Sequence, residues 1–137
     1  MKISYAHILV VDDDVTMRTY AVNSLRRLGI QLIETCTDGV SALHLLNSFK
    51  PDLVLTDIHM EPMGGLELVQ KIREHPDASV RNTKVIFMSS DARITTLQDT
   101  LPLGAMGYII KPLRTDTLLA KLENALGCSS RPIAECS

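Results

Sequence analysis

Chemically reactive side chains follow each of four short apolar runs in the chain. These side chains are carboxylates, hydroxyls and one ammonium: Asp12 to Asp14, Asp57, Ser89 with Ser90, and Lys111. If the runs are parallel strands of one sheet, their carboxyl ends share an edge, where open α/β sheets bind ligands. The spacing therefore predicts one site that combines carboxylates, a hydroxyl and an ammonium, a set suited to phosphoryl transfer.

The aspartates predict a metal site by their charge alone. Two unit charges about 4 Å apart repel by about 4 kcal/mol at an effective dielectric constant near 20. Asp12, Asp13 and Asp57 are therefore costly to bring together unless a cation lies among them or one stays protonated. Two or three carboxylates that leave positions for water and phosphate suit Mg²⁺. Helix capping is the alternative for such residues, but it accounts for one aspartate, Asp14, and not for three.

The strand-like runs alternate with helical patterns, which is typical of βαβ units and a parallel sheet. The expected strands cover residues 8–11, 30–36, 53–56, 85–88 and 106–110. Polar residues interrupt the second run, as is typical of an edge strand. Residues 75–82, around Pro76, are expected to form a loop.

Helical spacing of apolar residues predicts a helix after each strand. The inward-facing positions are Ala21, Leu25 and Leu28; Leu43 and Leu46; Leu66, Val69 and Ile72; Ile94, Leu97 and Leu101; and Leu118, Leu122 and Ala125. Met17, Met88 and Met106 are expected to fill the core. Arg18, Arg26 and Arg27 are expected to form a solvated helix face.

The composition is that of one ordinary globular domain. The 137 residues are 45% hydrophobic and 22% charged, with a net charge of −2, which favours neither nucleic acid nor a membrane as a partner. Neither a signal peptide nor a membrane-spanning segment is expected. Cys36, Cys128 and Cys136 lack CxxC spacing, so we expect reduced thiols and a cytoplasmic location. One domain over residues 1–127 and a flexible tail over 128–137 are predicted.

Residues 6–126 resemble the receiver domain of two-component response regulators. The motifs that carry the resemblance are Leu9 to Asp13, Thr56 to Gly65, the strand end at Ser89, and Gly107 to Pro112. The resemblance implies a flavodoxin-like (βα)5 doubly wound fold, an α/β architecture with a parallel five-stranded sheet in the order 2-1-3-4-5. That order places strands one and three side by side.

The resemblance also implies a role for each site residue. Asp57 would accept a phosphoryl group from the histidine of a partner kinase or phosphotransfer protein, forming an acyl phosphate. Asp12, Asp13, Asp57 and the backbone carbonyl of His59 would hold Mg²⁺. Lys111, next to a Lys-Pro bond that is typically cis in this family, and the hydroxyl of Ser89 would neutralise the phosphoryl oxygens. Such a domain is not an enzyme in the usual sense, although it assists its own phosphotransfer and dephosphorylation.

The expected output is a conformational switch. By the resemblance, Ser89 would move toward the phosphoryl group and the aromatic ring of Tyr108 would fill the vacated space. His59 and Asp91 stand at positions that modulate the lifetime of the acyl phosphate. A downstream protein would bind the face of the fourth helix, fifth strand and fifth helix. We expect a stand-alone receiver, either a chemotaxis-like messenger or a phosphorelay intermediate.

Two other functions fit parts of the sequence. Residues 11–16 also match the nucleophile loop of haloacid-dehalogenase-like phosphatases, with Asp12 as nucleophile and Asp14 as general acid. That alternative lacks a further acidic pair after Lys111 and gives Asp57 no task. A pseudo-receiver that only binds partners is the third hypothesis, and the intact set of Asp12, Asp13, Asp57 and Lys111 argues against it.

Overall fold

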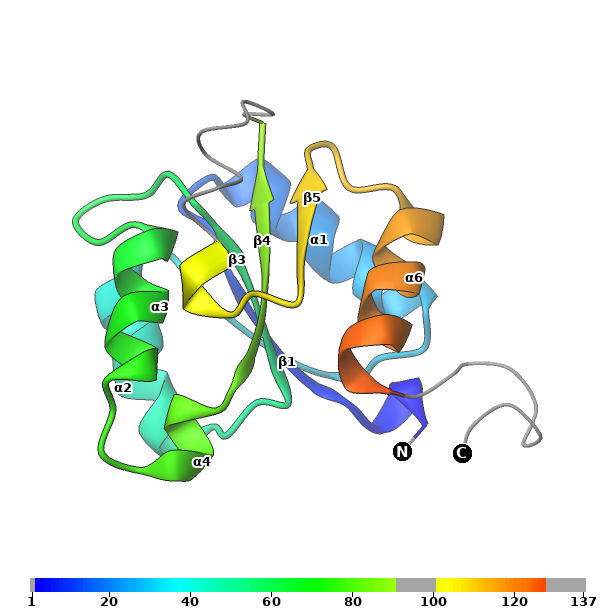
Figure 1. Cartoon of the computed structure of the whole chain (residues 1–137). Helices are drawn as coiled ribbons and strands as arrows, with labels where there is room; N and C mark the ends of the chain where they lie inside the picture. The colour runs from blue at the N-terminus through cyan, green and yellow to red at the C-terminus, as the bar shows by residue number, and fades with distance from the viewer. Residues whose placement is uncertain (1, 91–100, 128–137) are drawn as a thin grey trace.

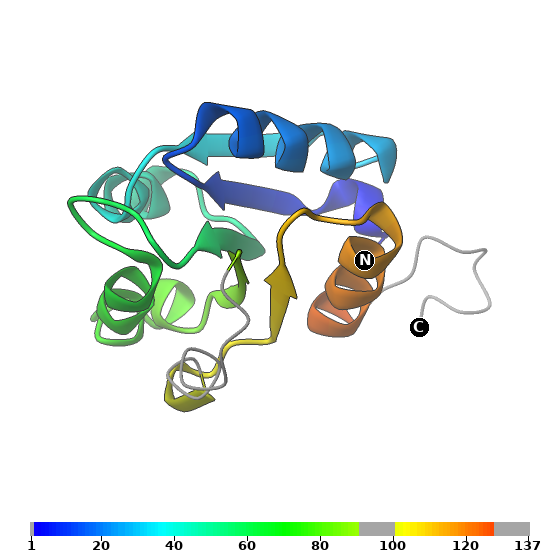
Figure 2. The same ribbon diagram turned by 90° about the horizontal axis from the view of Figure 1, so that it is seen from above.

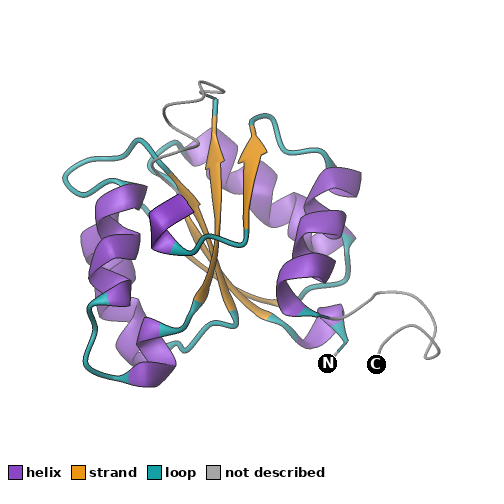
Figure 3. Ribbon diagram, in the orientation of Figure 1, coloured by secondary structure: helices purple, strands orange, loops and turns teal. Residues whose placement is uncertain are grey.

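A computed structural model describes residues 2–90 and 101–127 of the chain. Its centre is a parallel sheet of five strands in the order β2-β1-β3-β4-β5 (Figures 1 and 3). The strands are β1 (His7–Val11), β2 (Leu32–Cys36), β3 (Leu53–Asp57), β4 (Lys84–Ser89) and β5 (Gly107–Ile110). This is the flavodoxin-like order that the sequence predicted, with β2 at one edge. Each strand begins and ends within two residues of its expected bounds.

Helices cover both faces of the sheet (Figure 2). They are α1 (Val15–Arg27), α2 (Gly39–Ser48), α3 (Gly65–Arg73), α4 (Ala78–Arg81) and α6 (Thr115–Leu126), with 3-10 turns η1 (Ile3–Tyr5) and η2 (Leu101–Leu103). Helices α1 and α6 share one core cluster with the strands, and α2, α3 and α4 share the other. The described part of the chain is therefore a three-layer α/β sandwich.

Alternation along the strands divides the core into these two clusters. In β1, Ile8 and Val10 face the α1–α6 side, while Leu9 and Val11 face the α2–α3 side. All four side chains are fully buried, as are most residues of β3 and β4. Strands buried on both faces are expected to be continuous apolar runs, which is how these runs appear in the sequence.

The register of the sheet aligns the carboxyl ends of the strands. Val11 pairs with Thr56, so the residues that follow each, Asp12 and Asp57, leave adjacent strands at the same level. On the other side, Asp57 pairs with Met88. One edge of the sheet therefore collects the ends of β1, β3, β4 and β5.

The fold differs from the expectations at a few positions. The expected loop 75–82 contains the short helix α4. Asp77 caps the N-terminus of this helix, because its side chain accepts a hydrogen bond from the amide of Ser79. Four helical residues are too few to produce a readable periodicity. Of the methionines expected in the core, Met88 is buried, but Met106 is 38% exposed and Met17 is only half-buried.

Some expectations concern residues outside the described ranges. The helix expected around Ile94 and Leu97, Asp91, and the tail 128–137 all lie there, so they stay predictions. Within residues 2–90 and 101–127, no helix is long and apolar enough to cross a membrane.

Candidate functional site

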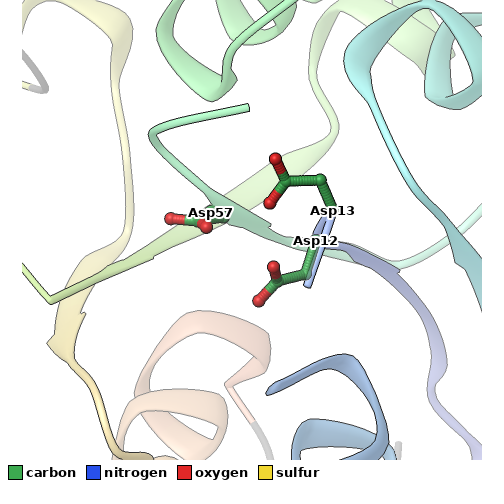
Figure 4. A group of neighbouring side chains, drawn as sticks. All are labelled: Asp12, Asp13 and Asp57. Atoms are coloured by element: carbon green, nitrogen blue, oxygen red, sulfur yellow. The ribbon is translucent and has the colours of Figure 1, made fainter. Parts of the chain in front are cut away.

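Three carboxylates meet at the carboxyl ends of β1 and β3. Asp12 and Asp13 follow β1 directly, and Asp57 is the last residue of β3 (Figure 4). One carboxylate oxygen from each lies within 4.8 Å of the others. Asp12 is fully buried and Asp57 is 7% exposed, whereas Asp13 is exposed. The three carboxylates therefore lie together, as their positions at the strand ends predicted.

Asp14 takes no part in this cluster. Its side chain accepts hydrogen bonds from the amides of Thr16 and Met17 at 2.9 and 3.3 Å and so caps the N-terminus of α1. An N-cap of this kind satisfies backbone N–H groups that have no partner inside the helix. The prediction that Asp14 is a helix cap is confirmed.

Lys111 reaches the acidic cluster from the end of β5. Its ammonium lies 2.8 Å from Asp12 Oδ2 and 3.0 Å from Asp57 Oδ2, with only 10% of the lysine side chain exposed. Its amide donates to the carbonyl oxygen of Ser89 at 2.7 Å, which ties the segment to the end of β4. The Lys111–Pro112 bond is cis, as the resemblance implied.

The charges at this site do not balance. Three carboxylates lie close to the ammonium of Lys111, and the carboxylates outnumber the positive charges at the site. Burial raises the pKa of Asp57, and the nearby charge of Asp12 adds to that effect, while the hydrogen bond and charge of Lys111 oppose it. For Lys111, burial works to lower the pKa, but hydrogen bonds and attraction from Asp12 and Asp57 outweigh it and raise the pKa. The lysine therefore stays charged, and Asp57 is incompletely compensated.

The donor set fits a divalent cation. Hard carboxylate oxygens from two neighbouring strands converge, and the protein's own cations neutralise only part of their negative charge, which suits a divalent cation such as Mg²⁺. The side of the cluster near Asp13 opens into a cavity of about 490 Å³, which leaves room for water and a phosphoryl group. The residues lining this cavity are Asp13, Asp14, Met17, Asp57, His59, Ser90, Lys111 and Pro112.

Ser89 and Tyr108 lie on the strands next to the cluster. Ser89 is the last residue of β4, fully buried and paired with Ile110 of β5. Tyr108 is half-buried and packs against the α2–α3 cluster, which also contains its strand neighbour Phe87. Because strand side chains alternate, Phe87 and Ser89 point to the same face as Tyr108. The structure thus places both expected switch residues on one face of the sheet.

Further polar residues near the site follow β3 and β4. His59 is exposed, and its amide donates to Asp57 Oδ1 at 3.4 Å, a long hydrogen bond. Glu61 is also exposed and lies with Asp13 and His59 around a second hollow of about 400 Å³. Ser90 is exposed at the cavity, and Asp91 lies outside the described residues.

One residue of the site escaped the sequence interpretation. Arg18 was expected on a solvated helix face with Arg26 and Arg27, but its guanidinium donates from Nη1 to the carbonyl oxygen of Asp12 at 2.8 Å. Arg26 and Arg27 are exposed, as expected. Nothing in the helical periodicity distinguishes Arg18, because its partner is a backbone atom of the preceding strand end.

The phosphatase alternative loses its nucleophile in this structure. Asp12 is fully buried and is not among the residues that line the cavity. Asp14, the general acid of that alternative, is engaged as the cap of α1. Asp57, which that alternative leaves without a task, lines the open cavity instead.

Comparisons with known proteins agree on one family. Residues 8–123 match the response regulator receiver domain family. The chain is 35% identical to chemotaxis protein CheY-3 of Vibrio cholerae serotype O1 over 116 residues, which is 85% of this chain and 88% of that protein. It is 33% identical to chemotaxis protein CheY of Pseudomonas aeruginosa, covering 85% of this chain and 92% of that protein. The solved structure of the chemotaxis response regulator CheY4 of Vibrio cholerae superposes with a TM-score of 0.78 at 28% identity, covering 88% and 98% of the two chains.

Proposed function

The chain belongs to the response regulator receiver domain family, and from this premise we propose that Asp57 is its phosphoacceptor. A phosphorylation-accepting signalling domain of this family needs one accessible carboxylate beside compensating positive charge. The observation that carries the proposal is the position of Asp57, which is held by Lys111 at 3.0 Å and also lines the open cavity.

The transfer itself needs little from the protein beyond position and charge. An oxygen of the Asp57 carboxylate attacks the phosphorus of a phosphohistidine on the partner. The new O–P bond forms as the P–N bond breaks, and the imidazole nitrogen keeps the electron pair. The ammonium of Lys111 already lies at Asp57 and would neutralise oxygens of the incoming group.

A divalent cation completes the proposed site. Asp12, Asp13, Asp57 and the backbone carbonyl of His59 would hold Mg²⁺, which when bound supplies positive charge to the phosphoryl oxygens. The support is the cluster of three carboxylate oxygens within 4.8 Å and its excess of negative charge. The protein's own contribution is to hold Asp12 rigidly in the core while Asp13 stays accessible.

Ser89 and Tyr108 are proposed as the switch. The hydroxyl of Ser89 would donate to a phosphoryl oxygen, and the ring of Tyr108 would move into the space that Ser89 leaves. The burial of Ser89 and the shared face of the two side chains support this role. For the phosphoryl group to shift this equilibrium, it must interact more favourably with the active state by the free energy of the shift.

The finer assignments follow the same proposal. The donor would be a sensor histidine kinase or a histidine phosphotransfer protein, and the receiving protein would bind the face formed by β5, α6 and the helix expected before β5. His59, exposed beside Asp57, and Asp91 would modulate the lifetime of the acyl phosphate. A cytoplasmic location stays a prediction.

The decisive experiment maps the phosphoryl group. The protein is incubated with acetyl phosphate or phosphoramidate and Mg²⁺, and the modified residue is located by mass spectrometry of its peptides. We expect phosphate on Asp57, none in Asp57→Asn, and none when a chelator removes Mg²⁺. Phosphorylation or phosphatase turnover that survives Asp57→Asn and disappears in Asp12→Asn would refute the assignment in favour of the phosphatase.

A further inference from the structure

Every polar atom of Asp12 has a partner in the structure. Its amide donates to the carbonyl oxygen of Cys36 at 3.1 Å, and its carbonyl oxygen accepts from Arg18 Nη1 at 2.8 Å. Its two carboxylate oxygens accept from the amide of Asp14 at 2.9 Å and from Lys111 at 2.8 Å. The proposed role of Asp12 in the metal site accounts for its contact with Lys111. It does not account for the hydrogen bond from the Arg18 guanidinium to its carbonyl oxygen.

Arg18 is well placed to restrain the backbone after β1. It lies in α1, is half-buried, and its own amide donates to the carbonyl oxygen of Asp14 at 2.9 Å. Asp14 in turn caps α1, so the helix holds the far end of the segment Asp12–Asp14. The guanidinium holds its near end. Because guanidinium is planar and always charged, it is a more directional donor than an amine.

Asp13 depends on that restraint more than its neighbours do. Its side chain is exposed, and within residues 2–90 and 101–127 no hydrogen bond or ion pair to its carboxylate is found. With no side-chain partner to hold it, the position from which this carboxylate reaches the site is set by the backbone at Asp13. The peptide that joins Asp12 to Asp13 carries the carbonyl oxygen that Arg18 holds.

We propose that Arg18 is a positioning residue that fixes the peptide between Asp12 and Asp13 and so orients the carboxylates for a divalent cation. This inference rests on the proposed function and deepens it. Mg²⁺ demands near-ideal octahedral geometry, whereas Ca²⁺ accepts a variable arrangement of oxygens. A residue that sets the geometry of the oxygens should therefore favour binding of Mg²⁺ over Ca²⁺.

Charge and geometry make opposite predictions for the loss of Arg18. If the residue acted only through its charge, its removal from an acidic site would strengthen cation binding, because one repulsive charge is gone. If it acts by positioning, its removal weakens Mg²⁺ binding. Loss of a group that orients metal ligands typically costs about 10- to 100-fold in metal affinity.

The test measures metal affinity by isothermal titration calorimetry, with MgCl₂ and CaCl₂ titrated separately into the unphosphorylated full chain. For Arg18→Met we expect Mg²⁺ affinity to fall about tenfold and Ca²⁺ affinity to fall less. Arg26→Met removes the same charge from an exposed position of the same helix and should leave both affinities unchanged. Arg18→Lys keeps the charge without the planar fork and should bind Mg²⁺ more weakly than the wild type.

The outcomes separate this inference from the function on which it rests. Saturable Mg²⁺ binding by the wild type, with equal or tighter binding by Arg18→Met, would overturn the role of Arg18 and leave the site intact. If the wild type shows no saturable Mg²⁺ binding, or if Asp13→Asn binds Mg²⁺ as tightly as the wild type, the metal site and the role of Arg18 are overturned together. If urea unfolding indicates that Arg18→Met does not fold, Arg18→Lys decides, because its charge is unchanged and wild-type affinity in it would refute positioning.

Discussion

Replacing Lys111 by methionine should destabilise the protein strongly in the absence of metal. The ammonium lies 2.8 Å from Asp12 Oδ2 and 3.0 Å from Asp57 Oδ2, and each attraction is about 5–6 kcal/mol at an effective dielectric constant near 20. Dehydration of the buried ammonium costs several kcal/mol and offsets part of this gain. Removing one partner of a buried ion pair typically costs about 3–5 kcal/mol, and we expect a loss of that size at about pH 7.

The sign of the pH dependence tests the cause. Asp57 already has a raised pKa, and Lys111 opposes that rise, so the pKa of Asp57 should rise further in Lys111→Met. A folded state that holds its proton more tightly than the unfolded state gains stability as the pH falls. The variant should therefore recover more stability than the wild type between about pH 7 and about pH 5.

Urea unfolding followed by circular dichroism measures both effects, with Lys2→Met as an exposed control. Mg²⁺ at about a hundredfold excess over its dissociation constant should restore about 2.7 kcal/mol by mass action. A loss below about 1 kcal/mol at neutral pH, comparable to an exposed pair, would refute the charge balance argued for the site. So would a loss that is identical at both pH values and insensitive to Mg²⁺.

Three further predictions concern the elements that position the site. A Cβ on Gly65 would overlap the carbonyl oxygen of Asp57, so Gly65→Ala should cost about 1–3 kcal/mol in urea unfolding. Gly107→Ala, where a Cβ approaches the flexible side chain of Lys121 at 3.2 Å and lies in ordinary van der Waals contact with Ile86 at 3.8 Å, should cost less, and equal losses would contradict this account. Asp14→Ala removes the cap of α1 and should cost about 1 kcal/mol, whereas Asp14→Asn should retain most of it; equal effects would exclude capping. Burial raises the pKa of the Cys36 thiol to about 12 from 9.0, so the folded state keeps a proton that the unfolded state loses. Stability should therefore fall by about 1 kcal/mol per unit above about pH 9, and Cys36→Ala should show a shallower slope.

Much of the fold could be predicted because buried parallel strands leave a strong pattern. The runs at β1, β3 and β4 are apolar at nearly every position, since helices cover both faces of the sheet. The weak run of β2 correctly indicated an edge, where Leu32 is 46% exposed. The order of the strands came from the family resemblance rather than from periodicity, because apolar runs alone do not specify which strands are neighbours.

The sequence predicted burial wrongly where an apolar residue lies at a position in the fold that offers little to pack against. Met106 was expected in the core, but it precedes β5, where its amide donates to the carbonyl oxygen of Val85. Its side chain is 38% exposed. Apolar character identifies residues that favour burial, but the end of an edge strand offers little surface to bury them against.

In the site, too, some residues could be predicted from the sequence and one could not. Carboxylates and the lysine at strand ends were predictable, because parallel strands bring their carboxyl ends together. Arg18 was not, because its partner is a backbone carbonyl oxygen, which the sequence does not mark. Asp12 is thus held by two cations with different consequences. Lys111 contacts a charged carboxylate oxygen of Asp12 and neutralises part of the negative charge of the site. Arg18 contacts the neutral carbonyl oxygen and restrains the peptide between Asp12 and Asp13. If this division is right, loss of Lys111 changes the response of stability to pH, and loss of Arg18 changes the choice between Mg²⁺ and Ca²⁺.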